Sequence, residues 1–173
     1  MIGLKRNTVK LKEWTPILAE LYENEKNIIL NKLKPETIDI QHVGSTSISS
    51  LKAKPIIDIA IGIEKLENGI KLIKSLENLD YEHRGNAGIE GRYFFVKGSE
   101  DCRSVYLHVE EYEGIIWRSH IVFRDILRKD ETLRLEYQNL KEKLAKEFPN
   151  DRDAYCKIKG EWIERVLKEN GWY

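Results

Sequence analysis

One segment of the chain combines a turn of small residues with a lone carboxylate. The run His42-Val43-Gly44-Ser45-Thr46-Ser47 predicts a strand that ends in a tight turn. After seven further residues comes Pro55-Ile56-Ile57-Asp58-Ile59-Ala60-Ile61, an apolar strand pattern that carries one acid. An ionised carboxylate is costly to bury alone, so we expect Asp58 to meet a cation, a hydrogen-bond donor or a metal ion.

A later strand pattern places polar groups on one face. Val105, Leu107 and Val109 alternate along it, which leaves Tyr106, His108 and Glu110 together on the other face. An imidazole with an unperturbed pKa of about 6.5 suits proton transfer or metal binding. The open alternative is that His108 only satisfies a partly buried polar surface.

The elements that position these residues follow from apolar periodicity. We expect a helix from Thr15-Pro16 to Pro35, strands over 38–43 and 57–63, a helix over 66–76, and strands over 93–97 and 104–110. From Trp117 the pattern is helical to the end, and Pro149-Asn150-Asp151 separates the last two helices and offers an N-cap. Without a long linker, residues 1–173 are predicted to form one α/β domain with a helical C-terminal portion.

Composition restricts the partners. Lys and Arg number 29 and Asp and Glu number 29, so no overall charge attracts a long nucleic acid. Cys102 and Cys156 lack metal-ligand spacing, and no second Cys or His pair completes a zinc site; reduced cysteines in a cytoplasmic protein are the simplest interpretation. No signal peptide and no apolar run of about 20 residues is present, so no membrane partner is expected.

The order and spacing of several motifs are similar to those of the GrpB family over nearly the whole chain. They are His42-Val43-Gly44-Ser45-Thr46-Ser47, Ala53-Lys54-Pro55-Ile56-Ile57-Asp58-Ile59, Gly88-Ile89-Glu90-Gly91-Arg92-Tyr93-Phe94, Leu107-His108-Val109, Trp117-Arg118-Ser119-His120, Phe123-Arg124-Asp125, Asp151-Arg152-Asp153-Ala154-Tyr155 and Lys157-Ile158-Lys159. Members of that family resemble the nucleotidyltransferase superfamily, which includes polymerase-beta-like enzymes. The resemblance implies a small mixed sheet with flanking helices and a helical C-terminal wall.

It also implies a reaction, the transfer of a nucleotidyl group from a nucleoside triphosphate to a small acceptor. The turn residues would lie on the phosphates, because a glycine allows close approach of the backbone. Asp58 would hold a divalent metal, Mg²⁺ or Mn²⁺, and His108 and Glu110 would complete the metal site or deprotonate the acceptor. The residues expected to bind the nucleotide and its phosphates are Gly44, Ser45, Thr46, Ser47, Lys54, Arg84 and Arg92.

The chain departs from the superfamily at Ala60, where a second carboxylate is expected two residues after Asp58. Three interpretations remain open. Glu110 replaces the missing carboxylate, His108 ligates a softer metal or acts as a base, or the site is a binding pocket without transfer chemistry. At the level of function, the alternatives are a module that binds a nucleotide, another anionic ligand or a partner without catalysis, and an ATP-dependent ligase.

Further residues are candidates for the wall of the cleft. They are His42, Tyr106, Arg118, Arg124, Tyr155 and Lys159. A structural, hydrogen-bonded role is the favoured alternative for His42, and core packing for Tyr155. Arg84 and Arg92 could equally form part of a solvated cationic face or pair with Asp58. Lys157 and Lys159 are expected to be exposed.

Overall fold

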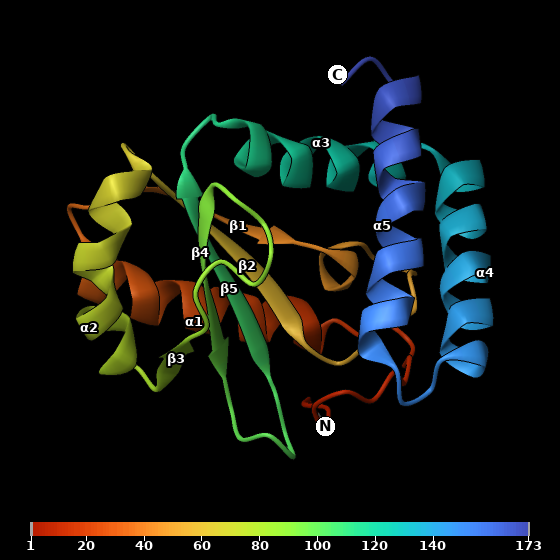
Figure 1. Cartoon of the computed structure of the whole chain (residues 1–173), viewed down its shortest axis with the longest axis horizontal. Coiled ribbons are helices and arrows are strands. Elements are labelled where there is room, and N and C mark those ends of the chain that lie inside the picture. The colour runs from red at the N-terminus through yellow and green to blue at the C-terminus, as the bar shows by residue number, and fades with distance from the viewer. Residues whose placement is uncertain (1, 173) are drawn as a thin grey trace.

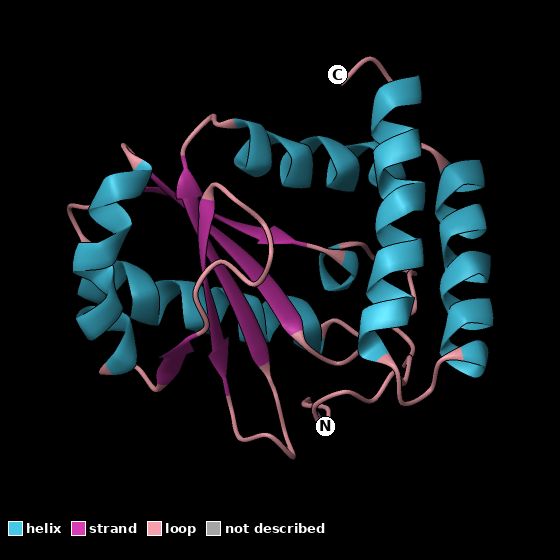
Figure 2. Ribbon diagram, in the orientation of Figure 1, coloured by secondary structure: helices cyan, strands magenta, loops and turns pink. Residues whose placement is uncertain are grey.

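A five-stranded mixed sheet organises the molecule. The computed structural model describes residues 2–172. Its strands are β1 (Thr37–Val43), β2 (Ile57–Ile63), β3 (Tyr81–His83), β4 (Arg92–Lys97) and β5 (Val105–Glu111). They lie in the order β1-β2-β5-β4-β3, and β2 and β5 form the parallel pair at the centre, while the other neighbours are antiparallel. Figure 2 shows the strands in magenta with the helices around them.

The central pair sets the chemistry of each face of the sheet. Asp58 lies opposite Tyr106, and Ala60 lies opposite His108. Because side chains alternate along a strand, the acid of β2 and the polar residues of β5 share one face. The isoleucines of β2 point to the other face, where Ile59 and Ile61 are fully buried.

That apolar face is covered by the N-terminal half of the chain. Helix α1 (Ile17–Leu33), the 3₁₀ helix η2 (Leu66–Leu72) and the short α2 (Ile73–Glu77) supply the covering residues. Tyr22 and Ile29 of α1 and Leu76 of α2 belong to the same buried cluster as the strands. Figure 1 shows these helices together at one side of the sheet.

The C-terminal third forms the other wall. Helix α3 (Ile115–Lys129) runs across the sheet, and α4 (Glu131–Glu147) and α5 (Arg152–Glu169) lie side by side (Figure 1). The side chains of Asp130 and Asp151 cap α4 and α5, because they accept hydrogen bonds from the backbone N–H groups of Leu133 and Ala154, respectively. A second apolar cluster joins these helices to the segment that follows β1, with Leu51, Phe123 and Tyr137 among its members.

The α/β fold with a helical C-terminal portion is confirmed, and so are four of the strands and the long helices. The helix predicted over 66–76 is present, but it is 3₁₀ over Leu66–Leu72 and α-helical only over Ile73–Glu77. Gly69 weakens α-helix and lies directly against the Tyr93 ring. Strand β3 was missed because three edge residues are too few to show a period. Within residues 2–172, no helix has the length and apolarity needed to cross a membrane.

Candidate functional site

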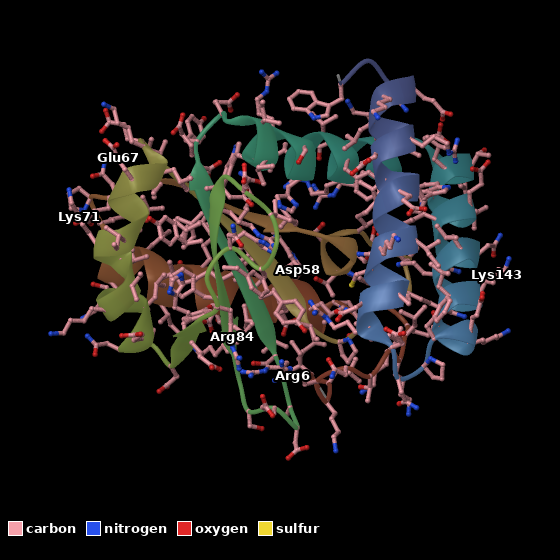
Figure 3. The ribbon with its side chains drawn as sticks, in the orientation of Figure 1. Arg6, Asp58, Glu67, Lys71, Arg84 and Lys143 are labelled. Atoms are coloured by element: carbon pink, nitrogen blue, oxygen red, sulfur yellow. The ribbon has the colours of Figure 1, made fainter. Side chains whose placement is uncertain are left out.

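A cavity of about 500 Å³ lies between the polar face of the sheet and the C-terminal helices. Its walls come from the turn after β1, from β2, β4 and β5, and from α3, α4 and α5. Figure 3 places Asp58 at the middle of the molecule, between the sheet and α5. Such a volume is in the range of small-molecule sites.

The turn after β1 lies directly against Asp58. Gly44 has a φ of +65°, and a Cβ added there would lie 2.6 Å from Asp58 Oδ2. Ser47 Oγ donates to the Gly44 carbonyl at 2.6 Å, which closes a short 3₁₀ turn. Gly44, Ser45 and Thr46 line the cavity. The residue without a side chain is therefore what allows the turn and the carboxylate to meet.

Asp58 of β2 lines the cavity. Its side chain is 30% exposed, and Oδ1 lies 3.6 Å from His108 Nε2. Burial opposes ionisation, but the contact with His108 and the charges of Lys54 and Lys159 outweigh it, so the pKa of Asp58 is lowered. The carboxylate is ionised at neutral pH and can accept a donor or a cation.

Behind Asp58, His108 is held by an arginine. Arg92 Nη1 lies 3.0 Å from His108 Nδ1, while Arg92 Nε donates to the Asn86 carbonyl at 2.9 Å. Both side chains are buried. Burial, together with the nearby charges of His120 and Arg92, lowers the pKa of His108 although Asp58 opposes this, so the imidazole is neutral at neutral pH.

Cations gather at the α5 end of the cavity. Lys54 Nζ lies 5.9 Å from the ring centre of Tyr106 and 5.6 Å from that of Tyr155. The Arg152 guanidinium lies 5.4 Å from the Tyr106 ring, and Lys159 Nζ 5.9 Å from the Tyr155 ring. Burial and the charges of Lys159 and Arg152 lower the pKa of Lys54 to about 8. Such a cluster is suited to an anionic ligand.

A second group could hold a metal ion. One ligand atom each from His108, Glu110 and His120 lies within 4.8 Å of the others. Glu110 is fully buried; its Oε1 lies 3.1 Å from His120 Nε2, and its Oε2 has no hydrogen-bond partner within the described chain. The Arg92 guanidinium already contacts His108 Nδ1, and a fixed positive charge there opposes a metal ion.

The position of the missing carboxylate is filled by apolar packing. Ala60 is fully buried, and it clusters with Val43 and Trp117. A carboxylate on that residue would meet the Trp117 ring instead of the cavity. The cavity therefore does not fit a two-metal cage on β2.

Several predicted site residues do line the cavity. The structure brings together Gly44, Ser45, Thr46, Lys54, Asp58, Arg92, Tyr106, His108, Tyr155 and Lys159. Lys159 was expected to be exposed, which is wrong: it is half-buried on the inner side of α5, whereas Lys157 is exposed. Glu110 and Ser47 lie behind the lining.

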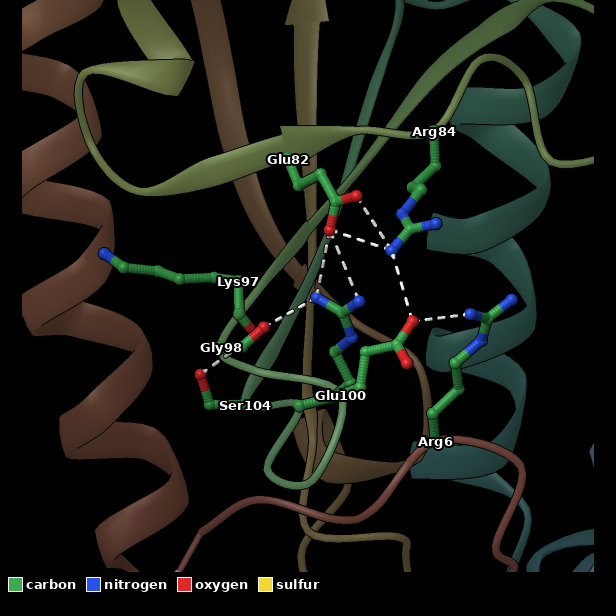
Figure 4. Close-up of polar contacts among 8 residues, drawn as sticks. Arg6, Glu82, Arg84, Lys97, Gly98, Glu100 and Ser104 are labelled. Carbon is green, nitrogen blue, oxygen red and sulfur yellow. Dashed lines mark hydrogen bonds and ion pairs between the residues drawn. The ribbon is translucent and has the colours of Figure 1, made fainter.

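The structure places other predicted residues elsewhere. Arg84 forms an ion pair with Glu82 at 2.8 Å at the edge of the sheet (Figure 4). His42 stacks on Tyr22 with ring centres 4.6 Å apart, and its Nε2 lies 3.0 Å from Thr46 Oγ1. These contacts support the structural alternative for His42, whose pKa burial lowers to about 4.

The two α3 arginines also lie outside this cavity. Arg118 packs its guanidinium 4.8 Å from the Trp172 ring. Arg124 donates through Nη1 to Gln41 Oε1 at 2.8 Å and to the His42 carbonyl at 3.1 Å, so it braces β1 against α3. Both line a separate surface hollow near β1.

Among the cavity residues that sequence reasoning missed are three with basic side chains: His120, Lys141 and Arg152. His120 and Arg152 belong to the family motifs, but nothing in a single strand or helix pattern aims them at Asp58. Lys141 is 1% exposed within an otherwise ordinary amphipathic helix, and its Nζ donates to the Lys52 carbonyl. A buried lysine cannot be recognised from periodicity alone.

The motifs, the mixed sheet and the helical wall define a GrpB-type α/β protein. A family model described as "GrpB protein" matches residues 8–169, so the chain belongs to the GrpB family. The glutamate-rich protein GrpB of Alkalihalophilus pseudofirmus is 34% identical over 173 residues, which cover 98% of this chain and 99% of the relative.

Two further similarities agree with this membership. The UPF0157 protein YqkA of Bacillus subtilis is 36% identical over 152 residues, which cover 88% of this chain and 44% of the relative. The chain thus spans less than half of that longer protein. The crystal structure of the conserved protein GrpB from Enterococcus faecalis superposes with a TM-score of 0.82 at 29% identity, covering 93% of this chain and 99% of that one.

Proposed function

We propose that the cavity binds a nucleoside triphosphate and that the protein transfers its nucleotidyl group to a small acceptor. One observation carries the proposal: the Gly44–Ser45 turn, the ionised Asp58 and the cations Lys54 and Lys159 line the same cavity. Triphosphates need close backbone approach and positive charge, and a nucleotidyl transfer site needs a carboxylate beside them.

The phosphates would lie between the turn and the cations of α5. Asp58 would hold one Mg²⁺ or Mn²⁺ ion together with the phosphates, and the ion would supply neutralisation of phosphate charge. In the transfer, an oxygen or nitrogen of the acceptor bonds to the α-phosphorus, the bond to pyrophosphate breaks, and the acceptor's proton passes to water. Tyr106 and Tyr155 offer aromatic surfaces to the rest of the ligand.

The test uses ATP with Mg²⁺ or Mn²⁺ in calorimetry, and mass spectrometry of products formed from a metabolite mixture. We expect Asp58→Asn to abolish triphosphate-dependent product formation with an unchanged circular dichroism spectrum. Lys159→Met should weaken ATP binding by about tenfold, the effect of losing one charge-assisted hydrogen bond. Lys157→Met, two residues away and exposed, is the matched control and should bind as the wild type does.

A non-catalytic binding module is the second candidate, and the packing of Ala60 against Trp117 favours it, because β2 supplies one carboxylate to the cavity where two are usual. If the protein binds ATP but forms no product with any acceptor tested, the binding module replaces nucleotidyl transfer as the proposed function. If the protein does not bind ATP, and Lys159→Met does not change its affinity for any anion, both candidate functions are wrong.

A further inference from the structure

The guanidinium of Arg92 contacts groups of the protein itself. Nε donates to the Asn86 carbonyl at 2.9 Å, Nη2 points to the Ala87 carbonyl at 3.5 Å, and Nη1 contacts His108 Nδ1 at 3.0 Å. The side chain is 9% exposed, and its guanidinium lies 4.9 Å from the Phe94 ring. These contacts fix Arg92 in place and leave it little capacity for a phosphate.

The contact with Arg92 decides where the proton of His108 lies. A guanidinium has donors and no acceptor, so Nδ1 must accept and the neutral ring must carry its hydrogen on Nε2. Nε2 faces Asp58 Oδ1 at 3.6 Å. The ring is also packed between aromatic neighbours, with centres 5.2 Å from Phe94 and 5.0 Å from His120.

We propose that Arg92 and His108 are positioning residues that orient the Asp58 carboxylate from behind. This proposal rests on the proposed function, in which Asp58 holds a metal ion beside the phosphates of the ligand. Arg92 selects the Nε2-protonated tautomer of His108, and the Nε2–H is directed at Oδ1, 3.6 Å from Nε2, which leaves Oδ2, beside Gly44, directed at the ligand. Hydrogen bonds of this kind to a ligating carboxylate fix its orientation.

The separation of 3.6 Å is slightly longer than a hydrogen bond. Hydrogen bonds of active sites are often long without a ligand and tighten in the complex, so the proposal places the full hydrogen bond in the ligand-bound protein. The arrangement excludes two other roles for His108 in the same state: Nδ1 is occupied by a guanidinium and cannot ligate a metal, and Nε2 carries a hydrogen and cannot take a proton. The proposal therefore gives His108 and Arg92 roles that differ from the base, metal ligand and phosphate contact expected from the sequence.

The first test reads the tautomer directly. In protein labelled with ¹⁵N at histidine, long-range ¹H–¹⁵N spectra should show His108 as the Nε2–H form in the wild type and in Arg165→Met. Arg165 is an exposed arginine of α5 paired with Glu169. Arg92→Met should shift His108 to a mixture of tautomers. A wild-type ring protonated on Nδ1, or a shift on adding one equivalent of Zn²⁺ that shows metal on Nδ1, overturns the proposal. This readout needs no turnover, so it stands even where the proposed reaction fails.

The second test separates positioning from phosphate binding. Arg92→Met should lower kcat by about 10- to 100-fold with little change in KM for ATP, the usual cost of losing a support for a ligating group. A raised KM with unchanged kcat would mean that Arg92 binds phosphate. If Arg92→Met does not fold, two variants of His108 provide the test. His108→Gln keeps a hydrogen-bond donor near the position of Nε2 and should retain most of kcat, whereas His108→Phe has no donor and should lose most of kcat. Equal loss in both His108 variants, as judged by folded protein, contradicts positioning through a donated hydrogen bond.

Discussion

Gly44 joins backbone conformation to the chemistry of the site. Its φ of +65° with a ψ of −172° belongs to a region that is essentially restricted to glycine. The missing Cβ also leaves room for Asp58 Oδ2. At this residue two independent requirements, a backbone angle and a close approach, select the same amino acid.

Gly44→Ala should destabilise the fold by about 1–3 kcal/mol because of the strained backbone and should displace Asp58. The control is Gly160→Ala, where an added Cβ meets no atom within 4 Å; alanine in that helix interior should stabilise by about 0.5–1 kcal/mol. Urea denaturation followed by circular dichroism measures both changes. Equal stability of the two variants would show that the turn relaxes without strain.

Residue patterns predicted part of the site. Alternation correctly placed Asp58 opposite the isoleucines of β2, and Tyr106 and His108 opposite the apolar residues of β5, because the period of a strand is local. The pairing of β2 with β5 then brings the three residues to one face of the sheet. The partners of these residues were not predictable. Arg92 and Arg84 look alike in the sequence, yet one lies buried behind His108 and the other pairs with Glu82 at the sheet edge. That difference is decided by strand pairing and loop path, which a single sequence does not show.

At the scale of elements, strand β2 directs Asp58 to the cavity, whereas Ala60, two residues later, is buried in the protein interior. Ala60 lies opposite His108 in the parallel register, but α3 covers it with Trp117. Helix α3 therefore closes the region where a second metal ligand would lie. Sequence reasoning identified the missing carboxylate at Ala60, but could not show that Trp117, 57 residues later in the chain, packs over this position.

Ala60→Asp tests this reading of β2. A carboxylate buried there without a partner should cost about 3–5 kcal/mol in the free energy of unfolding. Ala19→Asp, an exposed position in the first turn of α1, is the control and should change stability by less than about 0.5 kcal/mol. Denaturation and Mg²⁺ titration provide the measurements. A stable Ala60→Asp protein with tighter Mg²⁺ binding would mean that the position still opens to the cavity.

At the scale of the whole molecule, charge is segregated. The formal net charge is zero, with 29 basic and 29 acidic residues. The cavity nevertheless collects cations from four regions of the chain, namely Lys54, Arg92, Lys141, Arg152 and Lys159, against the acids Asp58 and Asp153. Burial and the charges of Lys159 and Lys54 hold the pKa of Lys141 well below its usual value. An anion bound in the cavity would relieve the mutual repulsion of these groups, so under the proposed function ligand binding is coupled to proton uptake.

This coupling predicts how ATP binding responds to pH. Lys54 has a lowered pKa of about 8, so it is charged below that pH and loses its charge as the pH rises through it. A bound polyanion favours the charged form, and binding near pH 8 should therefore take up a proton. Affinity for ATP should fall by about tenfold between pH 7 and pH 9.

Calorimetry in two buffers of different ionisation enthalpy measures the proton uptake. Lys54→Arg keeps its charge at pH 9 and should remove both the uptake and the fall, because an arginine does not titrate in this range. Proton uptake that persists unchanged in Lys54→Arg would assign the coupling to another group of the cavity.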